Sequence, residues 1–423
     1  MEQSKSEWAH LRYELTTALA LGFDSIWAHK LRSFLTLLGV IIGVASVILV
    51  GSAIDGLGLY AQQSTAKAFG TESYLVAQVA SAGDMSRKEY FDRLRTNKRI
   101  TMDEYRFLQE ANEENSIYSP YRQNQADIKR DSTVQEESSI IGCAAALSDI
   151  RDIGITDGRF FTSQEEKTRS FVAVIGDETR TNLFPEGSPL GKSIKINGID
   201  FRVVGVQEKL GSAFGQSRDK CAYIPISAYN RMFGPGNGFA LFARAKPDTT
   251  LSMTESLDYT RVALRTRFHL RPGQKDRFDT LTPDSIRGFV DTVLGMISVV
   301  VVPVTLISLV VGGIVIMNIM LVSVTERTHE IGIRKALGAR RFTVLLQILV
   351  EAVMLAFFGG ALGIGIGAIL TVILGKAFDL TLHITVTYVA LAIVVSTTVG
   401  VVSGWYPASR ASKLDPIEAL RSE

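Results

Sequence analysis

Four long apolar segments of the chain contain no Asp, Glu, Lys or Arg, and the polar positions gather between them. These segments are Ser33–Ile54 with 22 residues, Thr292–Thr325 with 34, Ala352–Gly375 with 24 and Leu380–Ser409 with 30. A helix needs about 20 apolar residues to cross a hydrocarbon layer about 30 Å thick. Buried helices of soluble proteins seldom run this far without a charge. The pattern therefore predicts four transmembrane helices.

The second apolar segment is longer than a membrane requires. Its 34 residues would form a helix of roughly 51 Å. The helical pattern also continues upstream through Pro283–Met296, and Pro303 could bend the helix where the membrane begins. The first segment likewise continues past Asp55. We therefore expect two helices that form a stalk outside the membrane.

Lys and Arg side chains are distributed unevenly around the four segments. They precede the first segment at Lys30 and Arg32, cluster in residues 326–341 and follow the fourth segment, whereas the loop between the third and fourth holds only Lys376. By the positive-inside rule, both termini and residues 326–341 are predicted to be cytoplasmic. The N-terminus lacks the pattern of a cleavable signal peptide, so the first span is expected to be an uncleaved anchor.

Short helices are predicted at both cytoplasmic ends. Apolar residues recur every three or four positions from Trp8 to Ile26, which predicts an amphipathic helix in the membrane interface. At the C-terminus, Asp415 as N-cap, Pro416 at the first helical position and Glu418 for a capping box predict another short helix.

The long polar segment between the first two spans reads as a mixed α and β domain, expected to have two lobes. Asn197-Gly198 joins two alternating runs, which is a strong hairpin signal. The polar stretch 80–98 is expected to be mobile. "GSPLGKS" at 187–193 has the wrong spacing for a phosphate loop and leads into a strand, so a turn is expected. The two cysteines, Cys143 and Cys221, leave a disulfide open.

A charged cluster lies between the second and third spans. We expect a helix from Val324 to Leu337 that ends near Gly338, with Glu330 and Arg334 paired and an apolar face at Ile333 and Leu337. Such a helix could bind a soluble protein and move both spans; the alternative is a basic clamp on lipid headgroups, against which the interleaved acids argue. The candidate docking residues are Glu326, Arg327, Glu330, Ile331, Ile333, Arg334, Leu337 and Gly338.

Small residues in the spans indicate close helix packing. Gly39 and Gly43 form one GxxxG motif, and Gly359, Gly363 and Gly367 form a double one. The general enrichment of glycine in membrane helices is the alternative reading. Two polar residues within the spans, Asn318 and Glu351, are expected to make interhelical hydrogen bonds rather than a proton path.

No catalytic pattern accompanies this organisation. Hydrophobic residues make up 46 %, and 45 basic residues nearly balance 43 acidic ones. The five histidines are scattered, and no zinc-protease motif, paired Cys-x-x-Cys or nucleophile elbow occurs. We therefore expect no catalytic residues, no metal site, no cofactor and no nucleic-acid partner in this chain.

Four stretches together resemble a known family. "KLRSFLTLLGVIIGVASVI", "GGIVIMNIMLVSVTERTHEIGIRKALGARR", "EAVMLAFFGGALGIGIG" and "GWYPASRASKLDPIEALRSE" are similar to the MacB-type, FtsX-like permeases of ABC transporters. The outer "GRFFTSQEE", "FPEGSPLGKSIKINGIDFRVVGV" and "AYIPIS" look like the periplasmic core domain of that family, so the resemblance covers nearly the whole chain.

The resemblance implies a dimeric permease of the bacterial inner membrane with Porter-like and Sabre-like lobes on its stalk. It implies that the charged loop is a coupling helix on a cytoplasmic ATPase, which binds ATP and Mg²⁺ and drives the outer domain by mechanotransmission. Only about 30 residues precede the first span and they hold no Walker motif, unlike MacB, so the ATPase is expected on a separate chain. A homodimer is expected, with a heterodimer as the alternative, and a periplasmic adaptor and an outer-membrane channel are further candidate partners.

The fold class expected is an α-helical membrane protein with four transmembrane helices and a mixed α/β extracytoplasmic domain on a helical stalk. Efflux of a periplasmic substrate is the leading hypothesis. Lipoprotein extraction or control of cell-wall hydrolases is a second, and an ATP-independent sensor or adhesin or a tethered enzyme belongs to other classes. The expected parts are a cytoplasmic N-terminal helix at 1–32, spans at 33–55, 342–375 and 384–406, an extracytoplasmic domain at 56–283, stalk and second span at 284–325, the coupling helix at 326–341 and a C-terminal helix at 407–423.

Overall fold

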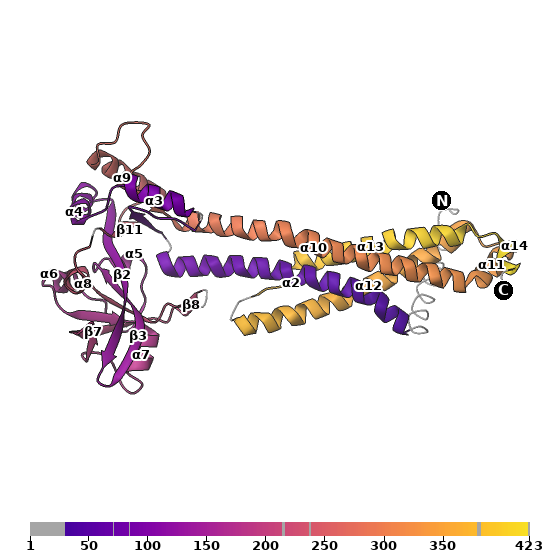
Figure 1. Cartoon of the computed structure of the whole chain (residues 1–423), viewed down its shortest axis with the longest axis horizontal. Coiled ribbons are helices and arrows are strands. Elements are labelled where there is room, and N and C mark those ends of the chain that lie inside the picture. The colour runs from indigo at the N-terminus through magenta and orange to yellow at the C-terminus, as the bar shows by residue number, and fades with distance from the viewer. Residues whose placement is uncertain are drawn as a thin grey trace. The chain divides into compact units, whose positions relative to one another are not determined.

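The computed structural model describes residues 30–70, 72–83, 85–213, 216–236, 238–378 and 382–421. The predicted N-terminal amphipathic helix falls mainly on residues outside these ranges. The chain divides into two compact units: a helical unit formed by 1–60 with 292–423, and an α/β unit formed by 61–291. Figure 1 shows the elements of each.

The helical unit confirms the four predicted transmembrane helices. Each helix has a long apolar stretch with at most two charged residues in an 18-residue window, which suits a membrane span. The helices are α2 (Lys30–Phe69), α10 (Pro283–Glu326), α12 (Arg341–Phe378) and α13 (Val386–Ser412), and two short helices, α11 (Thr328–Ala336) and α14 (Pro416–Arg421), accompany them.

Two of these helices run beyond the length of a membrane span. Helix α2 has 40 residues and α10 has 44, and Pro303 lies inside α10. Both helices continue from the helical unit into the α/β unit, because the unit boundaries fall at residues 60/61 and 291/292, within them. The sequence predicted the corresponding boundaries of the extracytoplasmic domain at 55/56 and 283/284.

Glycines bring α2 close to two neighbours. A Cβ added at Gly39 would lie 2.7 Å from Gly312 Cα of α10, and one at Gly43 would meet Leu309 of α10. On α12, Gly359, Gly363 and Gly367 lie against α2 at Val40, Val44 and Ile48, whose side chains are fully or almost fully buried. Both glycine motifs therefore lie where α2 contacts another helix, as small residues do in membrane proteins.

Glycines also bring the fourth transmembrane helix, α13, close to its neighbours. Gly400 and Gly404 of α13 lie against Ala356 and Ala352 of α12, and Gly313 of α10 meets Ser403 of α13. The four helices thus contact one another in a ring, α2 to α10, α10 to α13, α13 to α12 and α12 to α2. Asn318 lies instead on the exposed surface of α10, so its expected hydrogen bond to another helix remains a prediction.

The α/β unit is built on one ten-stranded mixed sheet. Its strand order is β12-β1-β11-β2-β3-β10-β5-β7-β4, with β6 paired to β2 and β7, and only β3–β10 and β5–β7 are parallel. The strands are β1 (Ser73–Ala77), β2 (Ser116–Arg130), β3 (Thr133–Cys143), β4 (Ile155–Gly158), β5 (Val172–Ile175), β6 (Ser193–Ile196), β7 (Ile199–Gln207), β10 (Cys221–Pro225), β11 (Ala240–Ala245) and β12 (Asp279–Leu281), and a separate small pair is β8 (Ser212–Ala213) with β9 (Gln216–Ser217).

Helices cover different parts of this sheet and so define two lobes. Helices α4 and α9 pack over β1, β11 and β2, whereas α7 and α8 pack over β3 and β10 (Figure 1). The predicted two-lobed α/β domain is therefore present, with both lobes sharing one sheet. The helices of the unit are α3 (Arg87–Thr96), α4 (Met102–Ala111), α5 (Leu147–Ile150), α6 (Ser163–Lys167), α7 (Asp177–Leu183), α8 (Ile226–Phe233) and α9 (Met253–Arg267).

Two local turn predictions in this unit are confirmed. Ile196 pairs with Ile199 across Asn197 and Gly198, both of which have positive φ, as a two-residue hairpin requires. The "GSPLGKS" stretch leads into strand β6 and not into a helix. The pattern therefore identified a hairpin and excluded a phosphate loop.

The structure also bears on the stretch 80–98 and on the disulfide that the sequence left open. The stretch 80–98, expected to be mobile, contains α3, whose N-cap Ser86 accepts a hydrogen bond from the Glu89 N–H and whose Arg93 pairs with Asp279 at 3.0 Å. Cys143 and Cys221 are free, buried thiols. On the parallel pair β3–β10, Cys143 lies beside Pro225, four residues beyond Cys221, so the thiols are too far apart to bond.

Candidate functional site

A short turn separates the second transmembrane helix from the charged helix α11. Helix α10 ends at Glu326 and α11 begins at Thr328, because Arg327 between them has φ −101° and ψ 17°, outside helical values. The Thr328 hydroxyl donates to the carbonyls of Val324 and Thr325, which competes with backbone pairing. The predicted continuous helix from Val324 to Leu337 is therefore broken at Arg327.

An ion pair ties this turn to the third transmembrane helix. Arg327 Nη1 lies 3.6 Å from Glu351 Oε1, and the Glu351 side chain is only 12 % exposed. A carboxylate this far from water is stabilised by a nearby guanidinium. Glu351, for which the sequence predicted a hydrogen bond to another helix, connects α12 to the start of α11 through this ion pair.

One face of α11 packs on the C-terminal part of the chain. Ile331 and Gly332 are buried, and Gly332 lies so close to Ala419 of α14 that an added Cβ would be 2.7 Å from the Ala419 Cβ. At the start of α14, the Asp415 carboxylate accepts from the Ile417 N–H at 2.9 Å, as expected of an N-cap. The side chain of Glu418 lies outside the described part of the chain, so its capping role remains a prediction.

Lys335 fixes the same face by a contact that the sequence did not reveal. Its Nζ donates to the carbonyls of Ser412 at 2.8 Å and Leu414 at 2.6 Å, at the C-terminal end of α13. Cations at this end of a helix satisfy free carbonyls and interact favourably with the helix dipole. Burial lowers the pKa of Lys335, Arg341 lowers it further and Asp415 acts in the opposite direction.

The end of α11 is a Schellman motif. Gly338 has φ +98°, its N–H donates to the Lys335 carbonyl, and the Ala339 N–H donates to the Arg334 carbonyl. A residue with a side chain is strained at this φ, so a glycine suits the position. The structure therefore places a helix stop at Gly338, where the sequence predicted one.

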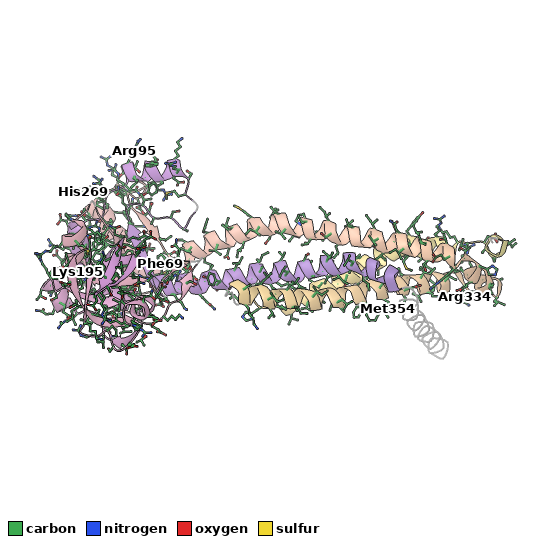
Figure 2. The ribbon with its side chains drawn as sticks, turned by 60° about the horizontal axis from the view of Figure 1, so that its bottom comes forward. Phe69, Arg95, Lys195, His269, Arg334 and Met354 are labelled. Carbon is green, nitrogen blue, oxygen red and sulfur yellow. The ribbon has the colours of Figure 1, made fainter. Side chains whose placement is uncertain are left out.

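The opposite face of α11 is open. Leu337 is 84 % exposed and Ile333 is 42 % exposed, and Glu330 and Arg334 are exposed beside them. Figure 2 shows Arg334 at the end of the helical unit. Arg334 donates to Gln347 of α12 at 3.1 Å, and the expected pair with Glu330 is not formed between these two described side chains. We call Glu330, Ile333, Arg334 and Leu337 the α11 surface.

The α11 surface is exposed and is both apolar and charged, and the opposite face of the helix is fixed by packing and hydrogen bonds. On α14, Ile417 is also 76 % exposed. Exposed apolar side chains surrounded by charges are typical of protein-binding sites, because burying them in a partner removes apolar area from water. Among the described residues, no group of three or more His, Cys, Asp or Glu side chains could hold a metal ion.

Family models match two long parts of the chain, and two relatives align with nearly all of it. Residues 33–257 match the MacB-like periplasmic core domain, and residues 303–416 match the FtsX-like permease C-terminal family. The macrolide export ATP-binding/permease protein MacB of Bdellovibrio bacteriovorus is 35 % identical over 414 residues, with 97 % of this chain and 62 % of that protein covered. The protein of the same description from Neisseria gonorrhoeae is 31 % identical over 426 residues, with 100 % and 63 % covered.

A solved structure is also similar. The periplasmic region of MacB from Actinobacillus actinomycetemcomitans aligns with a TM-score of 0.43 and 16 % identity, covering 53 % of this chain and 95 % of that one. Of the two full-length MacB proteins named above, the chain spans a little over three fifths of the length.

Proposed function

Because the chain belongs to the family of MacB-type, FtsX-like ABC transporter permeases, we propose that it converts ATP hydrolysis by a cytoplasmic ATPase into movement of its α/β unit. The α11 surface is the proposed docking site of that ATPase. The ATPase, which binds ATP and Mg²⁺, is proposed to lie on a separate chain. The permease itself supplies no catalytic residues in this proposal.

The observation that carries the proposal is the contrast between the two faces of α11. The buried face is fixed by Ile331, Gly332 and the two hydrogen bonds of Lys335, whereas Leu337 on the other face is 84 % exposed. A helix held this firmly moves with the helices on which it is mounted. A partner bound to the α11 surface would therefore move α10 and α12 as well, because the ion pair of Arg327 and Glu351 joins the turn after α10 to α12.

The movement is proposed to pass along α10 and α2, which are continuous from the helical unit into the α/β unit. A substrate would then be moved outside the membrane and would not pass between the spans. Close packing supports this route: at Gly39 and Gly363 even an added Cβ would lie within 2.9 Å of another helix. Such contacts leave no room for a solute between these helices of one copy.

The proposed setting is the bacterial inner membrane, with both termini and α11 in the cytoplasm and the α/β unit outside. The distribution of Lys and Arg supports this orientation. Two copies are proposed to form the permease, with export of a periplasmic substrate as the task, since relatives are described as macrolide export proteins. A periplasmic adaptor and an outer-membrane channel are further proposed partners.

Copurification tests the docking site. In Leu337→Asp, a charge would have to be buried in the interface, so we expect recovery of the ATPase with the permease from detergent-solubilised membranes to fall at least tenfold. Val134→Asp, at an exposed position of β3 in the α/β unit, is the matched control and should retain the ATPase. Equal recovery with both variants, together with unchanged permease-stimulated hydrolysis, would refute docking at α11.

A further inference from the structure

The α/β unit contains a pocket that the proposed coupling does not use. The pocket has a volume of about 540 Å³ and lies between the C-terminal end of α2, strands β2, β3 and β10, and the segment around β9. All of its lining residues belong to the α/β unit. Pockets of roughly 300–1,000 Å³ are typical of small-molecule sites.

The charged residues that line the pocket are all basic. Arg151 and Arg218 are the two charged residues among the 12 that line the pocket, and no carboxylate is among them. Carboxylates next to the lining are already engaged, and Asp152, which follows Arg151 in the chain, pairs with Arg244 at 2.6 Å. Asp219 accepts from the backbone N–H groups of Leu210 at 2.7 Å and Gly211 at 2.8 Å, and Glu178 accepts from the hydroxyl of Ser217. The pocket therefore presents positive charge to a ligand.

Arg151 is held in place by aromatic rings and retains an unused donor. Its guanidinium carbon lies 5.3 Å from the ring centroid of Phe242 and 6.0 Å from that of Tyr121. Its buried Nε has no hydrogen-bond partner among the described residues, and neither has the buried hydroxyl of Ser139, which also lines the pocket. Burial raises the pKa of Tyr121 and the charge of Arg151 opposes this rise, as expected of groups that interact electrostatically.

The guanidinium groups of Arg151 and Arg218 define the charge that a ligand must offer. An acceptor with negative charge forms the strongest hydrogen bonds with a guanidinium. The rest of the lining is mixed: Ile141 and Leu210 are apolar, Tyr121 and Tyr223 are aromatic, and the polar side chains are those of Gln123, Gln216 and Ser217. A matching ligand therefore has an anionic group at one end and a body with both aromatic or apolar and polar parts.

We propose that this pocket binds a small organic anion, a carboxylate or phosphate ester whose body has both aromatic or apolar and polar parts, and whose anionic group pairs with the guanidinium of Arg151. The binding needs neither ATP nor the ATPase. It therefore goes beyond the proposed coupling function, and either one can fail without the other.

Two fluorescent probes that share one aromatic group test the charge preference. The full chain is reconstituted in nanodiscs of phosphatidylcholine and titrated with dansylglycine, an anion, or dansylcadaverine, a cation. Empty nanodiscs give the signal from partition into lipid. We expect saturable binding of dansylglycine at least tenfold tighter than that of dansylcadaverine, because only the anion can pair with Arg151.

Variants locate the binding. Arg151→Gln should weaken dansylglycine binding at least tenfold, and Arg151→Lys should weaken it less because the charge stays. Gln123→Trp, at an exposed position of the lining, should block the pocket by volume and does not depend on refolding around a changed buried charge. Arg202→Gln, at an exposed arginine of β7 outside the lining, is the matched control and should bind as the unchanged protein does.

A further titration in nanodiscs that contain phosphatidylglycerol separates two sources of the anion. If the anionic lipid displaces dansylglycine, the ligand is a lipid headgroup, and if it does not, the ligand is a soluble molecule. The proposal is overturned if dansylglycine does not saturate, if both probes bind equally, or if Arg151→Gln and Gln123→Trp bind dansylglycine as tightly as Arg202→Gln.

Discussion

At the residue scale, two glycines on one helix have opposite surroundings. A Cβ added at Gly363 of α12 would lie 2.8 Å from the Val44 Cβ and 2.9 Å from the Ile41 carbonyl oxygen, whereas a Cβ at Gly365 would have no neighbour within 4 Å among the described residues. The two positions differ by two residues, which is about 200° around a helix. One faces α2 and the other faces away from it.

The pair gives a matched test of helix packing. Gly363→Leu would force α2 and α12 apart, so we expect it to destabilise the helical unit by about 3 kcal/mol or more. Gly365→Leu should not destabilise the unit and should raise its stability by up to about 1 kcal/mol, because the side chain meets open space and leucine favours a helix more than glycine does. Thermal unfolding of the purified full chain in one nonionic detergent measures both. A similar loss in both variants would contradict the packing of α12 on α2.

At the element scale, the continuity of α10 is the property that the proposed coupling needs. The helix has 44 residues and crosses the boundary between the two units at residues 291/292. Near this boundary, Val293 is 37 % exposed and Met296 is 64 % exposed, so both can be replaced without leaving a buried cavity. Glycine at such positions weakens a helix by about 1 kcal/mol each relative to alanine.

We predict that stiffness at this point affects coupling and not docking. Val293→Gly with Met296→Gly should reduce the ATP-dependent change in distance between spin labels at Gln216→Cys of two copies to less than half. Val293→Ala with Met296→Ala should leave this change intact, because alanine removes the same side chains and keeps the helix firm. Both pairs should bind the ATPase equally. An undiminished distance change in the glycine pair would rule out transmission through α10.

At the scale of the whole molecule, orientation in the membrane is the property that the proposed function most depends on. We predict that a maleimide unable to cross the membrane labels Gln216→Cys in intact spheroplasts and labels Lys413→Cys only after lysis. Both native positions are exposed, and the two native cysteines are buried and should react little. Labelling of Lys413→Cys alone in intact spheroplasts would reverse the orientation and remove α11 from the cytoplasm.

Much of the architecture could be read from the sequence because the signals are local. Runs without charge identify four spans, since the cost of placing a charge in hydrocarbon acts on each residue by itself. Asn197-Gly198 and Gly338 mark a hairpin and a helix end because a positive φ is required at each position. No local apolar pattern predicted helix α3 within 80–98, because this helix is mainly polar and is held to the unit through Arg93 and Asp279, which are remote in the chain.

The functional surfaces were decided by tertiary structure. Lys335 meets the carbonyls of Ser412 and Leu414, and Arg327 meets Glu351, only after the helices have packed. The pocket around Arg151 likewise combines a helix end, three strands and a loop from separate parts of the chain. A pattern along the sequence reports the periodicity and charge of each segment, but not which unpaired polar groups of distant segments come to face one another. That depends on the packing of side chains between segments, which is a property of the folded chain alone.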